Sequence, residues 1–104
     1  MPRIPLAVRK DIEIAEGVAD VERLLAPDVV YIRFNVGEDW SGDPAVTFNV
    51  MLSDDAGKNR LWETAKKVRA CLDDRLDFEA LGLYRYPHFR TQSEQAVLKS
   101  KDWD

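Results

Sequence analysis

Residues 29–52 read VVYIRFNVGEDWSGDPAVTFNVML, and this stretch decides the fold. On both sides of the central GEDWSGDP, residues 37–44, apolar and polar residues alternate, as is typical of strands that bury one face. Two such strands joined by a loop of this length form an antiparallel hairpin. We expect its buried face to carry Val30, Ile32, Phe34, Val36, Val46, Phe48, Val50 and Leu52.

The residues before the hairpin predict an amphipathic helix from Asp11 to Leu25, because apolar residues recur there at spacings of three and four. Pro27 ends this helix near Ala26, since proline disfavours helical backbone in the residue before it. Gly17 weakens the interior of the helix by about 1 kcal/mol relative to alanine. The expected apolar stripe contains Ile14, Val18, Val21 and Leu25, broadened by Ala15 and Leu24.

A second helix is predicted after the hairpin, from about Asn59 to Arg75. The segment SDDAGKN before it has the composition of a turn. Asp54, Asp55 or Asn59 is expected to cap the helix by accepting hydrogen bonds from its first free amides. The apolar stripe of this helix is expected to contain Leu61, Ala65, Val68, Leu72 and Leu76.

Patterns are weaker in the C-terminal third of the chain. The run LDFEALGL predicts a short helical turn, with Asp77 as its cap and Gly82 as a terminating residue with positive φ. A third strand is expected around residues 88–93, and Pro87 confines it to starting there or lying at a sheet edge. The final KSKDWD is interpreted as a tail with Trp103 folded back.

The order helix, strand, strand, helix, with a third strand near the C-terminus, predicts an α+β fold. Its expected form is a two-layer sandwich in which the two helices cover one face of the sheet. A chain of 104 residues has the length of one domain. We therefore expect a single domain over residues 1–104, with a structured core at about 11–97.

Charge and composition disfavour several classes of protein. The 15 basic and 19 acidic residues give a formal net charge of -4, which repels nucleic acid unless the basic groups gather on one face. The lone Cys71 and lone His88 form neither an internal disulfide nor a structural zinc site, which favours a reducing compartment. No segment has the apolar length of a secretory signal or a membrane span, and we expect a cytoplasmic protein.

The loop GEDWSGDP has two interpretations. Glu38, Asp39 and Asp43 are oxygen ligands of the kind that Mg²⁺ or Ca²⁺ prefers, although the loop lacks the ligand spacing of an EF-hand. Serine, glycine, aspartate and proline are also the usual residues of a chain reversal, and we favour that reading. Trp40 either packs over the end of the core or anchors a partner protein, and the sequence leaves both roles open.

The run YRYPHFR, residues 84–90, interleaves aromatic residues with arginines. Such residues stack on bases in single-strand binders, enrich protein interfaces, or close a core. The outward face expected for the hairpin is polar, with Tyr31, Arg33, Asn35, Thr47, Asn49 and Met51. An open hairpin edge needs protection or a partner, which favours strand pairing between two copies.

Catalytic signals are sparse in the sequence. It contains no G-x-S-x-G or H-E-x-x-H motif and no glycine-rich phosphate loop, and Cys71 lies near the apolar stripe of the second helix. We expect no catalytic residue, no metal site and no cofactor. A small acidic metal-dependent enzyme stays open as an alternative, built from Asp39, Asp43, Asp54 or Asp55.

Two runs carry a family resemblance: DWSGDPAVTFNVMLSDD, residues 39–55, and DFEALGLYRYPHFRTQSEQA, residues 77–96. They resemble a group of small, mostly uncharacterised bacterial stand-alone proteins with a D-W-[ST]-G-D-P hairpin, an S-D-[DE] turn and an F-R-[ST]-x-S-E-Q-A segment. The resemblance covers about residues 30–97. It implies a larger helical partner of the HEPN type and a two-component complex of toxin and antitoxin character, but it assigns no site residue.

The order of elements is also similar to the KH-like fold of ribosome-binding factor A, which implies RNA binding as the alternative function. The chain lacks the G-x-x-G clamp of KH domains, and its acidic balance opposes that role. We expect instead a non-enzymatic protein-interaction module that binds a dedicated protein partner or a second copy of itself. Its expected contact residues are Asp39, Trp40, Asp43, Tyr84, Tyr86, His88, Phe89 and Arg90.

Overall fold

The computed structural model of the chain describes residues 6–99 and 101–103. The elements are α1 (Leu6–Leu24), β1 (Val29–Glu38), β2 (Pro44–Leu52), α2 (Asp54–Asn59), α3 (Leu61–Arg75), α4 (Phe78–Leu81), β3 (Tyr84–Thr91), α5 (Gln92–Leu98) and the 3₁₀ turn η1 (Lys101–Trp103). Within the described residues the strands form one mixed sheet in the order β1-β2-β3. The central strand, β2, is antiparallel to β1 and parallel to β3.

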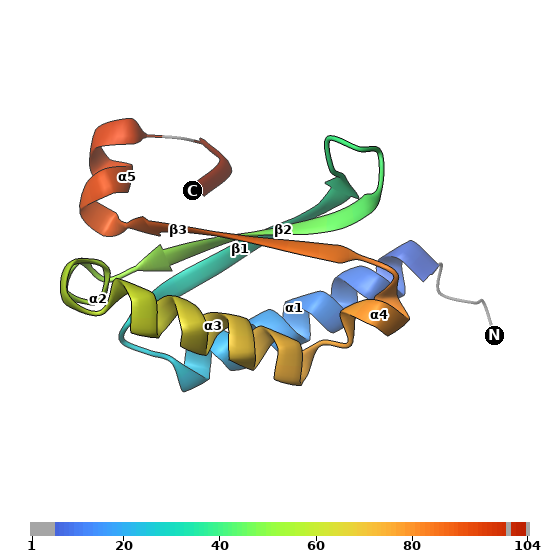
Figure 1. Cartoon of the computed structure of the whole chain (residues 1–104), viewed down its shortest axis with the longest axis horizontal. Coiled ribbons are helices and arrows are strands. Elements are labelled where there is room, and N and C mark those ends of the chain that lie inside the picture. Colours follow the sequence, from blue (N-terminus) through green and yellow to red (C-terminus); the bar gives the residue numbers. More distant parts are fainter. Residues whose placement is uncertain (1–5, 100, 104) are drawn as a thin grey trace.

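Figure 1 shows the layers of the molecule: α1 and α3 lie on one face of the sheet, and α5 with the C-terminal turn lies over part of the other. The chain returns from β2 to β3 through α2, α3 and α4, and a crossover of this length is what a parallel strand pair requires. The predicted α+β fold, with an antiparallel hairpin and a third strand at the sheet edge, is confirmed.

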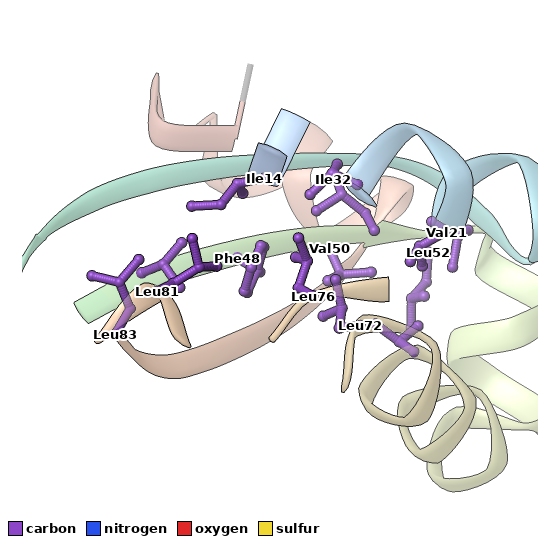
Figure 2. Packing of buried hydrophobic residues seen from close by; sticks show 14 residues of the cluster. Ile14, Val21, Ile32, Phe48, Val50, Leu52, Leu72, Leu76, Leu81 and Leu83 are labelled. Atoms are coloured by element: carbon purple, nitrogen blue, oxygen red, sulfur yellow. The ribbon is translucent and has the colours of Figure 1, made fainter. Parts of the chain in front are cut away.

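The hydrophobic core lies between the helices and one face of the sheet (Figure 2). Four alternating residues of β2 are wholly buried, as the period of two in the sequence predicts. The helix stripes meet them from α1 and α3. The buried residues of these three elements include Val46, Phe48, Val50 and Leu52 from β2, Ile14, Val18 and Val21 from α1, and Val68 and Leu72 from α3.

Two residues of the predicted buried face are exposed. Val30 is exposed because the register of the hairpin shifts between Val29 and Tyr31, so that Val29 takes the buried position instead. Val36 follows the predicted alternation but is 37% exposed. It lies on β1, an edge strand of the sheet, beside a groove that the first half of α1 also lines.

Helix α1 begins earlier than predicted, at Leu6, and ends at Leu24. The predicted broadening of its apolar stripe was wrong, because Ala15 and Leu24 are both exposed. Gly17 has a packing role that the sequence does not reveal. A Cβ atom at this position would lie 2.7 Å from Leu76 Cδ2, so glycine permits α1 to approach the end of α3 closely.

The segment after β2 forms a helix of its own rather than a turn. Ser53, not one of the three predicted caps, begins α2: its Oγ accepts a hydrogen bond from the Ala56 amide at 3.2 Å. Helix α3 then starts at Leu61, which is exposed although it falls on the predicted stripe. The prediction for α4 is confirmed, with Asp77 as its cap and Gly82 at a φ of 70° after its last turn.

The C-terminal segment differs most from prediction. Strand β3 begins at Tyr84, before Pro87, and the chain then forms α5, which was not predicted. The signal for α5 is a capping box in which Thr91 and Glu94 each accept a hydrogen bond from the other's backbone amide. Trp103 folds back onto the sheet as expected and is 6% exposed. No helix in residues 6–99 is both long and apolar enough to span a membrane.

Candidate functional site

The GEDWSGDP loop is a tight turn organised by one carboxylate. Asp39 Oδ1 accepts hydrogen bonds from the Ser41 amide at 2.9 Å and the Asp43 amide at 3.0 Å. The Asp39 carbonyl accepts the Gly42 amide at 3.0 Å, and Gly42 supplies the positive φ of 81° that closes the turn. The Asp39 amide in turn donates to the Asp43 carbonyl at 2.9 Å, so these four hydrogen bonds hold the chain on either side of Trp40.

Trp40 and Tyr86 form an aromatic pair beside this turn. The Tyr86 hydroxyl donates a hydrogen bond to Asp39 Oδ2 at 2.9 Å, and the two rings lie 5.4 Å apart at an interplanar angle of 58°. Trp40 is nonetheless 84% exposed, so it does not cover the core. An indole held on one side by a fixed ring and open on the other has the geometry of a contact anchor.

Hydrogen bonding also sets the charge at this turn. Desolvation raises the pKa of Asp39, but the hydrogen bonds from Tyr86, Asp43 and Ser41 outweigh it, and the pKa lies below its usual value. The hydrogen bond to Asp39 raises the pKa of Tyr86, and partial burial adds to that effect. At neutral pH this pair is therefore a carboxylate and a neutral phenol that donates to it.

The other predicted contact residues divide between the two faces of the sheet. Tyr84 is exposed at the same end as the turn, opposite Ala45 and on the same face as Tyr86. His88 and Arg90 follow along that face. Phe89 points the other way and packs against the core, with the Arg69 guanidinium 5.7 Å from its ring. We call Asp39, Trp40, Tyr84 and Tyr86 the aromatic surface.

Beyond the aromatic surface, the sheet face that carries no long helix forms a shallow trough of about 800 Å³. Trp103 bounds it, with the Arg90 guanidinium 4.6 Å from the centre of its ring. The carbonyl of Trp103 accepts a hydrogen bond from the Tyr31 hydroxyl, and Arg90 also donates to Gln95. The lining residues are Arg33, Phe34, Asn35, Thr47, Asn49, His88, Phe89, Arg90 and Trp103.

The contact prediction from the sequence did not include Arg33, Asn35, Thr47 or Asn49. The sequence could have indicated them, because they are the outward-facing positions of the two alternating strands. The hairpin register places these four polar residues side by side on one face. Trp62 was also missed and is 67% exposed on α3, with the Lys66 ammonium 5.3 Å from its ring. The sequence did indicate this exposure, because Trp62 lies outside the predicted apolar stripe of its helix.

The acidic residues that a metal-dependent enzyme would need are divided between the two ends of β2. Asp39 and Asp43 precede this strand, whereas Asp54 and Asp55 follow it, and its nine residues span about 30 Å. Asp54 accepts from Ser93 Oγ at 2.6 Å, and Asp55 accepts from Arg60 at 2.6 Å. Among the residues that the structure describes, no group of three or more His, Cys, Asp or Glu side chains is arranged to hold a metal ion.

Comparison with protein families, with curated proteins and with solved structures found no match to this chain. The inference about a binding surface therefore rests on the exposed side chains and their geometry.

Proposed function

We propose that this chain is a non-enzymatic protein-interaction domain that binds a dedicated partner protein through the aromatic surface. The observation that carries the proposal is the 84% exposure of Trp40 on a turn that is fixed by hydrogen bonds. Tryptophan and tyrosine dominate the energetics of protein interfaces because they bury a large apolar area with few rotatable bonds.

The contacts around Trp40 favour binding over mere exposure. Association costs entropy when side chains and loops must be ordered, and a surface that is already ordered avoids part of that cost. Here Tyr86 fixes the indole from one side, Asp39 fixes Tyr86, and the turn amides fix Asp39. The partner would then present an apolar pocket for Trp40 and a donor for the exposed carboxylate of Asp43.

The proposed biological role follows from the resemblance of residues 39–55 and 77–96. The domain would be the regulatory, antitoxin-like half of a two-component system, and the partner a larger helical protein of the HEPN type. In that arrangement the domain inhibits its partner by covering a surface, which needs contact area rather than a catalytic group.

The test is to recover the tagged chain from its own cells, with and without nuclease, and to identify what accompanies it. A stoichiometric protein that survives nuclease is expected. Trp40→Ala should weaken its binding by about 30-fold or more, the effect of losing a central aromatic anchor of about 2 kcal/mol. Trp62→Ala is the matched control, since it removes another exposed indole, from α3.

Binding that is equally tight in Trp40→Ala and wild type would remove the aromatic surface from the proposal. Loss in both tryptophan variants with intact thermal stability would move the contact to a wider surface that includes α3.

A second candidate function, RNA binding, is favoured by one observation: Arg33, His88 and Arg90 line the same trough, next to the Trp103 ring. Basic and aromatic groups on one sheet face suit a single strand even in a chain of net charge -4. This function predicts that RNA co-purifies, disappears with nuclease, and binds with an affinity that falls steeply with salt and in Arg90→Ala.

A further inference from the structure

The outer edge of β1 has backbone groups that pair with no neighbouring strand, and the hydrogen-bond pattern shows which residues carry them. The amide of Ile32 donates to Glu22 Oε2 at 3.2 Å, on the side away from β2. Because backbone groups of alternate residues in an antiparallel pair point to the same side, the groups of Phe34, Val36 and Glu38 also face away from β2. The pairing of Glu38 with Pro44, which has no amide hydrogen, agrees with this assignment.

The open stretch has two defined limits. Glu22 of α1 occupies the edge at Ile32. At the other limit the Asp39 amide turns inward to the Asp43 carbonyl at 2.9 Å. Between these limits, no group in the described residues accepts from the outward amides of Phe34, Val36 or Glu38. The opposite edge of the sheet differs, because Pro87 interrupts the row of donors on β3.

An apolar groove of about 870 Å³ runs beside this stretch, between β1 and the first half of α1. Val36 and Ile12 are both exposed in it, and Ala15 lines it as well. Its charged lining residues are Lys10 and Asp11, which have opposite charges. A second groove of the same kind can therefore face it without gathering charge of one sign.

We propose that the occupant of this edge is a second copy of the same chain, paired antiparallel through β1 about a two-fold axis at Val36. When the open stretch 34–38 pairs antiparallel with the same stretch of a second copy, the two-fold axis falls at its central residue, Val36. Val36 then lies opposite Val36 of the second copy, and Phe34 lies opposite Glu38. With two bonds per pair, this register forms about six intermolecular backbone hydrogen bonds and one continuous six-stranded sheet.

The side chains suit this register as well as the backbone does. Val36 points to the same face as the buried Ile32, so at the axis the two copies of Val36 meet over the groove. Ile12 of each copy lies beside them and becomes covered. The pairing removes from water the exposed apolar groups of the edge, which is the usual way in which an unprotected edge strand is satisfied.

The aromatic surface is separate from this edge, since Trp40 leans on Tyr86 of β3. The dimer and the partner binding proposed above can therefore fail independently. Trp40→Ala should leave the dimer intact, and loss of the dimer should leave Trp40 exposed.

Sedimentation equilibrium of the whole chain between about 1 µM and 1 mM tests the dimer directly. Val36→Lys places two cations together at the axis and should weaken dimerisation by about tenfold or more. Val36→Pro removes the outward amide at an edge-strand position, where proline is tolerated, and should have the same effect. Val30→Lys is the matched control, because Val30 is exposed on the same strand outside the open stretch.

Amide hydrogen exchange gives a second readout within the wild-type chain. Protection of the Val36 amide should rise with protein concentration, whereas the Ile32 amide, already bonded to Glu22, should be protected at every concentration. A chain that is monomeric to about 1 mM overturns the proposal. A dimer that Val36→Lys and Val36→Pro both leave unchanged overturns it too.

Discussion

On the face of the sheet that α1 and α3 cover, Phe48 and Val50 have no exposed area, whereas their neighbours Thr47 and Asn49 on the opposite face stay partly exposed and line a polar trough. One strand thus alternates between two roles. Apolar packing on the helix face is non-directional and stabilises the fold. Polar and aromatic groups on the other face depend on specific hydrogen bonds and remain available for recognition.

The polar face has one covered region, at the end of β2 away from the turn. Met51 points to that face yet is buried, because η1 packs there and Trp103 lies beneath Arg90. Helix α5 is held in place by Ser93, whose amide and hydroxyl both donate to Asp54. The sheet therefore has three kinds of region: a buried helix face, a covered part of the polar face, and an exposed remainder. Each of the following substitutions tests how much one contact contributes to stability.

The largest effect is expected from truncation on the helix face. Phe48 is wholly buried and packs edge-on against Phe78, with 5.9 Å between ring centres. Phe48→Ala should lower the free energy of unfolding by about 3–5 kcal/mol, since it removes transfer free energy and leaves a cavity. Urea denaturation measures this. The neighbouring Thr47→Ala should change it by less than about 0.5 kcal/mol, and similar losses for both variants would contradict a division between the faces.

An intermediate effect is expected at the covered part of the polar face. Trp103→Ala should cost about 2 kcal/mol, because it uncovers Met51 but opens no enclosed cavity. Thermal unfolding checks the change, and Trp40→Ala provides the comparison. Removal of that exposed indole should leave the melting temperature within about 1 °C of wild type. A stable Trp103→Ala protein would mean that the C-terminal turn does not stabilise the sheet.

The smallest effect is expected from the carboxylate that holds α5. The hydrogen bonds from the Ser93 hydroxyl and amide lower the pKa of Asp54. A lowered folded-state pKa contributes stability above the unfolded value of about 4, and this contribution is lost as the pH falls through the folded-state pKa. Melting temperatures from about pH 7 to pH 3 should therefore fall less steeply in Asp54→Asn than in wild type. Asp74→Asn, on the exposed surface of α3, should keep the wild-type dependence.

The fold was predictable where a periodic pattern and a turn agreed. Alternation around GEDWSGDP placed Ile32, Phe48 and Val50 correctly, and Asp77 with Gly82 correctly marked α4. Errors arose where a single residue broke the period, as at Val30, where the register shift exchanges inside for outside. Helix α5 was missed because Thr91 and Glu94 begin a helix with no apolar stripe and no buried residue.

The candidate site was predictable only in its parts. Asp39, Trp40 and Tyr86 were singled out from separate motifs, but 45 residues lie between Trp40 and Tyr86, and no local pattern indicates that their rings touch. Their contact depends on the parallel pairing of β3 with β2, which places Tyr86 beside Thr47. The parallel direction itself depends on the length of the crossover, which sequence patterns describe poorly.

By itself the sequence determined the α+β class, the hairpin, the GEDWSGDP turn and most of the core, because each follows from interactions between residues near one another in the chain. Only the tertiary structure decided what is exposed. Trp40 is exposed and Trp103 is buried, and on the edge of β1 the Ile32 amide is bonded to Glu22 whereas the Val36 amide has no acceptor in the described residues. Exposure depends on which segment covers a residue, and that segment is usually distant in sequence. Which side chains are accessible at the surface is therefore decided by packing rather than by pattern.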